Sequence, residues 1–124
     1  MARVLVVDDD IDMLDALEIW LGREHQVLRA TGVKDAMALL AEEPTPDVIL
    51  TDYDLGRGTG DELLAWVAVQ YPQVRRILHT GTPRERLDGA GALAHHVVKK
   101  GSSLEKISEA VNDFFRSCPG LMAA

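Results

Sequence analysis

Short apolar runs alternate with helical patterns along this chain, and the alternation restricts the fold more than any other feature. Residues Val4–Val7 form a four-residue apolar run, too short for a helix and β-branched enough for a buried strand. Apolar residues then recur three or four positions apart, as on one face of a helix: Ile11, Leu14, Leu17 and Leu21. Because alternating strands and helices pack as a parallel sheet with helices on both faces, the pattern predicts an α/β fold.

Four further apolar runs predict the remaining strands. They lie at Gln26–Ala30, Val48–Leu50, Ile77–Leu78 and Val97–Val98. Helical stripes begin at Val33, Leu63 and Leu104, and a weaker one lies between Thr82 and His96. In that weaker stripe each of two glycines costs a helix about 1 kcal/mol. We therefore expect five strand–helix units, with the more polar strand Gln26–Ala30 at an edge of the sheet.

Composition excludes several classes of protein. A chain of 124 residues with 47% hydrophobic residues is long enough for one globular domain. The net charge of −7 argues against a surface for nucleic acid or anionic membrane, since both need a basic patch. Cys118 has no partner for an internal disulfide, and neither a signal peptide nor a membrane span is visible. We expect a soluble, cytoplasmic domain.

Polar residues stand where the predicted strands end. In open parallel sheets, ligands bind outside the carboxyl ends of the strands. The residues at these ends are Asp8, Asp9, Asp52, Asp54, Thr80, and Lys99 or Lys100. We therefore expect carboxylates, a hydroxyl and an ammonium group to converge at one end of the sheet.

This set of residues indicates phosphoryl chemistry with a hard cation. Two negative charges about 4 Å apart repel by roughly 4 kcal/mol at an effective dielectric near 20, so clustered acids need a counter-charge. Oxygen ligands favour Mg²⁺, with Mn²⁺ and Ca²⁺ as weaker candidates. Asp52 has the character of a carboxylate nucleophile that forms an aspartyl phosphate. A lysine from the last strand would offset charge on the phosphoryl oxygens.

Three segments resemble the receiver domains of response regulators, of the CheY-like kind. They are "VLVVDDD", "VILTDYDLGRGTG" and "ILHTG", and the similarity extends from about Arg3 to Phe115. The resemblance implies a doubly wound (βα)5 flavodoxin-like fold, a three-layer sandwich around a parallel five-stranded sheet of order 2-1-3-4-5. It also implies a receiver domain over residues 1–118 and a disordered C-terminal tail over residues 119–124.

The resemblance implies a role for each residue at the strand ends. Asp52 is the phosphoacceptor, and Mg²⁺ is bound by Asp8, Asp9, Asp52 and the backbone carbonyl of Asp54. Thr80 is the switch hydroxyl. The implied donor is a histidine kinase or phosphotransfer protein, and the phosphorylated domain switches an output partner that the sequence does not identify. Such a protein loses its phosphoryl group slowly and is not a turnover enzyme.

Two lysines can serve as the site lysine. Alignment on the helix that follows selects Lys100, with Gly101 in place of the family's usual proline. Alignment on an aromatic residue three positions earlier selects Lys99, with His96 standing in for the aromatic. We favour Lys100, which puts Val97 in the aromatic position, and keep Lys99 as the alternative register.

Two other functions stay open. The Asp52-x-Asp54 motif resembles that of haloacid-dehalogenase-type phosphatases, although that signature normally ends the first strand and this chain has no room for a cap domain. A pseudo-receiver that binds a partner without phosphorylation is the second alternative. Whether the chain is a complete single-domain regulator or a receiver from a longer protein also stays open.

Overall fold

Residues 1–56, 58–82 and 93–117, which the computed structural model describes, form a parallel sheet of five strands in the order β2-β1-β3-β4-β5. The elements in chain order are β1 (Arg3–Val7), α1 (Ile11–Leu21), β2 (Gln26–Ala30), α2 (Val33–Ala41), β3 (Val48–Thr51), α3 (Gly60–Gln70), β4 (Arg75–Thr80), β5 (His96–Lys99) and α5 (Leu104–Ser117). The predicted fold class, the strand order and the edge position of β2 are confirmed. Most of the weak helical stripe between β4 and β5 lies outside the described residues. The tail at 119–124 lies wholly outside them.

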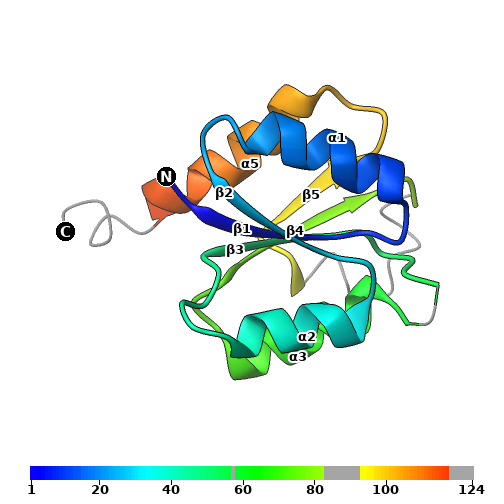
Figure 1. Ribbon diagram of the computed structural model, residues 1–124, viewed down its shortest axis with the longest axis vertical. Coiled ribbons are helices and arrows are strands. Elements are labelled where there is room, and N and C mark those ends of the chain that lie inside the picture. Colours follow the sequence, from blue (N-terminus) through cyan, green and yellow to red (C-terminus); the bar gives the residue numbers. More distant parts are fainter. Residues whose placement is uncertain (57, 83–92, 118–124) are drawn as a thin grey trace.

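Two apolar clusters hold the three layers together, one on each face of the sheet. Helices α1 and α5 cover one face, and α2 and α3 cover the other (Figure 1). Successive residues of β1 enter the two clusters alternately, with Val4 and Val6 on the α1–α5 side and Leu5 and Val7 on the opposite side. A strand buried on both faces needs an uninterrupted apolar run, which is why β1 and β3 could be recognised without alternation.

Hydrogen bonds across the sheet bring the strand ends to a common edge. Val7, the last residue of β1, is paired with Thr51, the last residue of β3. The next backbone N–H group, that of Asp52, donates to the carbonyl of Val7 at 3.0 Å. On the other side of β4, the Lys100 N–H donates to the carbonyl of Thr80 at 2.9 Å. The polar residues after these strands therefore lie at the carboxyl end of one sheet. Among the described residues, no helix is long and apolar enough to cross a membrane.

Candidate functional site

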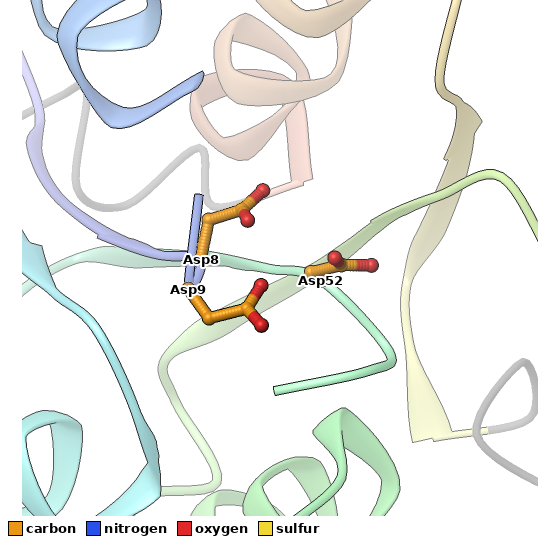
Figure 2. A group of neighbouring side chains, drawn as sticks. All are labelled: Asp8, Asp9 and Asp52. Atoms are coloured by element: carbon orange, nitrogen blue, oxygen red, sulfur yellow. The ribbon is translucent and has the colours of Figure 1, made fainter. Parts of the chain in front are cut away.

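Three carboxylates gather where β1 and β3 end (Figure 2). One oxygen atom from each of Asp8, Asp9 and Asp52 can be chosen so that all three lie within 4.8 Å of one another. Asp8 and Asp52 are buried, with 1% and 8% of their surface exposed, whereas Asp9 is exposed. Like charges held this close in a partly buried site repel strongly, so the cluster requires positive charge nearby.

The turn between β1 and α1 fixes the first two acids. The Asp8 N–H donates to the Ala30 carbonyl at 3.1 Å, which continues the β1–β2 pairing beyond the last strand residue. The Asp8 carboxylate accepts the N–H of Asp10 at 3.0 Å. Asp10 itself caps α1, as the sequence predicts, by accepting the N–H groups of Asp12 and Met13. Helix α1 therefore starts immediately after the acidic pair and leaves Asp8 little freedom to turn away.

The Asp52 carboxylate is held at both of its oxygen atoms. Oδ1 accepts the N–H of Tyr53 at 2.7 Å, and Oδ2 accepts a hydrogen bond from the Lys100 ammonium at 2.8 Å. The same ammonium lies 3.1 Å from Oδ2 of Asp8. Lys100 therefore joins the ends of β1 and β3 to the end of β5 through two charge-assisted contacts.

Burial and nearby charges shift the pKa values of Asp8 and Lys100. Burial, the largest influence, raises the pKa of Asp8; the Asp10 N–H and Lys100 act against it, and the Asp52 charge adds to it. Burial on its own lowers the pKa of Lys100, but the hydrogen bonds and charges of Asp52 and Asp8 outweigh it and raise that pKa above its ordinary value. The Lys100 ammonium therefore stays charged at neutral pH. It contacts Asp8 and Asp52, two of the three clustered acids.

The two candidate lysines occupy different surroundings. Lys100 contacts Asp8 and Asp52, as described above. Lys99 is the exposed last residue of β5 and lines a groove between β5 and α5, together with Ser102 and Lys106. Among the described residues, Lys100 is the lysine that forms ion pairs with these acids. The geometry favours the register that selects Lys100.

Thr80 ends β4 beside this cluster. Its side chain is buried, and its hydroxyl oxygen accepts the N–H of Thr82 at 3.1 Å. Val97, three residues before Lys100, packs against the apolar cluster on the α2–α3 side. The adjacent His96 instead pairs with Asp113 of α5 at 2.8 Å. Val97 thus occupies the position where the resemblance implies an aromatic residue.

The loop between β3 and α3 holds Asp54 by contacts within the loop. Asp54 forms an isolated antiparallel bridge with Thr59, closed by bonds from Gly60 N–H to the Tyr53 carbonyl and from Leu55 N–H to the Gly58 carbonyl. Neither bond uses the carbonyl of Asp54. Its carboxylate is exposed and accepts the Gly56 N–H at 3.1 Å, and the three-acid cluster does not include it.

The donor set fits Mg²⁺. Its ligands are oxygens, and they come from three carboxylates that a single ion can share. Mg²⁺ ligands stand about 2.1 Å from the ion, so neighbouring ligands are about 3 Å apart and opposite ligands about 4 Å apart. The three oxygens, which lie within 4.8 Å of one another, would therefore move closer together to bind one ion. Asp8, Asp9 and Asp52 are the residues that could supply these oxygens.

Thr51, which lies next to Asp52, has no role that the sequence pattern predicts. It is fully buried, and its hydroxyl donates to the backbone carbonyl of Asp52 at 2.9 Å. In the sequence it marks only the end of an apolar run, and periodicity carries no signal for a bond between neighbouring residues. The only available signal was a polar residue at a position where β3 is buried on both faces.

Comparison with known proteins agrees with the fold. The family model described as response regulator receiver domain matches residues 4–112. The chain is 36% identical over 112 residues to response regulator protein PilR of Pseudomonas aeruginosa, covering 88% of this chain and 25% of PilR. It is 40% identical over 80 residues to the hydrogenase transcriptional regulatory protein HoxA of Cupriavidus necator, covering 64% of this chain and 16% of HoxA. The chain thus spans a quarter or less of these relatives.

Solved structures show the same fold. The response regulator protein TrrA of Thermotoga maritima, in complex with Mg²⁺-BeF, superposes with a TM-score of 0.83 at 22% identity. That match covers 92% of this chain and 99% of TrrA. The family match covers most of the sequence. The chain therefore belongs to the response regulator receiver domain family, the signalling modules of two-component systems.

Proposed function

We propose that Asp52 accepts a phosphoryl group from a histidine kinase or phosphotransfer protein, and that the modified domain, spanning residues 1–118, switches its contact with an output partner. The observation that carries this proposal is the environment of the Asp52 carboxylate. It is fixed by the Tyr53 N–H and by Lys100, and it lies within a cluster of acids suited to Mg²⁺. Family membership supports the same conclusion.

The reaction forms an acyl phosphate. A carboxylate oxygen of Asp52 forms a bond to phosphorus while the bond from phosphorus to the donor's leaving atom breaks, and the leaving group keeps that electron pair. Lys100 offsets negative charge on the transferred group and on the acids around it. Mg²⁺, bound by Asp8, Asp9, Asp52 and the Asp54 carbonyl, would offset charge on the phosphoryl oxygens. Thr80 would donate a hydrogen bond to one of those oxygens.

The domain acts once per phosphoryl group rather than as a turnover enzyme. The phosphatase alternative needs the Asp54 carboxyl group as an acid and base beside Asp52. That carboxylate instead accepts the Gly56 N–H within its own loop, which disfavours this role. The single cysteine fits action in a reducing cytoplasm. The acidic composition supports action through protein partners, without nucleic acid or membrane contact by this domain.

A small phosphodonor tests the proposal. With acetyl phosphate and Mg²⁺, the intact protein should gain the mass of one phosphoryl group, and hydroxylamine should remove it, as expected for an acyl phosphate. Asp52→Asn should abolish the gain. Retention of the added mass by Asp52→Asn would place the chemistry on another residue. An unmodified wild-type protein would favour the pseudo-receiver alternative.

The lysines provide a matched pair for the same assay. Lys100→Gln should slow the mass gain or change the lifetime of the product, because it removes the ammonium from Asp52. Lys99→Gln removes an equal charge one residue away, at an exposed position. Equal effects of the two substitutions would mean that general surface charge, rather than the contact with Asp52, is responsible.

A further inference from the structure

The peptide group that links Asp52 to Tyr53 makes a hydrogen bond at each end. At its carbonyl end, the oxygen of Asp52 accepts the hydroxyl of Thr51 at 2.9 Å. At its amide end, the N–H of Tyr53 donates to Oδ1 of Asp52 at 2.7 Å. One rigid, planar group thus connects a buried hydroxyl with the carboxylate proposed to carry the phosphoryl group.

Backbone packing leaves this peptide group little room for other positions. A Cβ atom added to Gly60 would overlap the carbonyl oxygen of Asp52 and crowd the Cα of Tyr53. The N–H of Gly60 donates to the next carbonyl, that of Tyr53, at 2.6 Å. The start of α3 therefore lies against the peptide group from one side, while the Thr51 hydroxyl bonds its oxygen.

We propose that Thr51 is a positioning residue for the phosphoacceptor. Its hydroxyl fixes the plane of the Asp52–Tyr53 peptide, and the N–H of that peptide fixes Oδ1 of the carboxylate. Oδ2 is thereby directed at Lys100. The inference rests on the proposed phosphoacceptor function of Asp52 and adds to it a residue that acts through the backbone without touching the donor.

A purely structural role for Thr51 predicts different behaviour. A buried carbonyl needs a hydrogen-bond donor, so loss of the hydroxyl should lower stability under either account. Only the positioning role predicts that the reaction rate and the Tyr53 amide resonance change when the hydroxyl is removed and stay unchanged when a variant keeps the hydroxyl but is less stable. The two effects can be separated because serine keeps the hydroxyl but loses the buried methyl group, whereas valine does the reverse.

Three variants at one position, compared with the wild type, test the proposal in the full chain. Thr51→Val and Thr51→Ala lack the hydroxyl, and Thr51→Ser retains it. We expect the rate of modification by acetyl phosphate with Mg²⁺ to fall about tenfold in the valine and alanine variants, the worth of one well-placed hydrogen bond. Thr51→Ser should keep a rate near that of the wild type, although its melting temperature falls. If the valine variant does not fold, the alanine–serine pair still isolates the oxygen atom.

The amide resonance of Tyr53 provides a readout that does not depend on phosphorylation. Its proton should shift upfield in Thr51→Val and Thr51→Ala, as expected for a weakened bond to Oδ1, and stay near the wild-type position in Thr51→Ser. Wild-type rates together with an unmoved amide in the hydroxyl-free variants would overturn the proposal. A wild-type protein that takes up no phosphoryl group would instead refute the proposed function. In that case the amide shifts alone would decide whether Thr51 positions the carboxylate.

Discussion

The two ends of the sheet use polar side chains in opposite ways. At the amino end, acceptor atoms are matched to backbone donors: Nδ1 of His25 accepts the N–H of Ala2 at 3.0 Å, and Oδ2 of Asp47 accepts the N–H of Arg3 at 2.9 Å. At the carboxyl end, three carboxylates lie together, and the Lys100 ammonium contacts two of them, Asp8 and Asp52. The first arrangement satisfies the backbone and stabilises the fold. The second leaves negative charge in place, which a divalent cation would offset.

Stability and function are thus separated along the strands. A carboxylate at the amino end should stabilise the protein under all conditions in which it is ionised. A carboxylate at the carboxyl end should cost free energy until a cation arrives, because its neighbours have the same charge. The predictions below compare the two ends, beginning with the largest expected effect.

Gly60→Ala tests how the carboxyl end keeps its shape despite the repulsion. The new Cβ would overlap the backbone of Asp52, so we expect the free energy of unfolding to fall by about 3 kcal/mol, as for an overpacked site. Gly81→Ala is the control, since no atom of the described residues lies within 4 Å of its added Cβ. Urea denaturation measures both. Equal, small effects would mean that the close approach of α3 to Asp52 is not needed to hold the site.

Asp47→Ala tests the amino end. The substitution removes the acceptor of the Arg3 N–H, and we expect a loss of about 2 kcal/mol in the free energy of unfolding. Asp47→Asn keeps an oxygen at the same place and should lose less. If alanine and asparagine cost the same, the charge of Asp47 rather than its hydrogen bond is what matters at this end.

His25 provides a pH-dependent test of the same end. Burial lowers its pKa from 6.5; Glu24 and Asn112 oppose the shift, and the amino terminus adds to it. The unfolded chain therefore binds a proton before the folded chain does, and stability is lost as the pH falls below about 6.5. His25→Asn keeps an acceptor for the Ala2 N–H without titrating there, so its stability should depend less on pH in this range. Identical pH profiles from denaturation would argue against a role for this histidine.

The polar residues at the carboxyl end of the sheet were predictable from the sequence, and most of the contacts at its amino end were not. Asp8 and Asp9 come straight after one apolar run and Asp52 comes one residue after another, and parallel strands in register must bring such residues together. The choice of Lys100 over Lys99 depended on aligning the helix that follows. Asp47 and His25 act through single bonds to backbone N–H groups, and such bonds depend on exact placement rather than on periodicity.

Thr51 shows the same limit within the site itself. Its bond to the Asp52 carbonyl joins adjacent residues, and no spacing rule predicts it. The helical stripe between Thr82 and His96 was weak because of its glycines, and residues 83–92 lie outside the part that the structure describes. Sequence patterns thus predicted the layers and the charges of the site, but not the backbone contacts that orient them.

The central claim is that the clustered acids cost free energy until a cation binds. It is tested most directly, by the smallest expected change, if the melting temperatures of the wild type and of Asp9→Asn are measured as Mg²⁺ is added. Asp9 is exposed and belongs to the acid cluster, so neutralising it relieves repulsion without removing the contacts of Lys100. Without Mg²⁺, we expect the variant to be more stable by up to about 1 kcal/mol. With Mg²⁺ at ten times its dissociation constant, the wild type should gain about 1.4 kcal/mol, and the variant much less. The account would be contradicted if the variant is less stable than the wild type without Mg²⁺, or if Mg²⁺ does not change the melting temperature of the wild type.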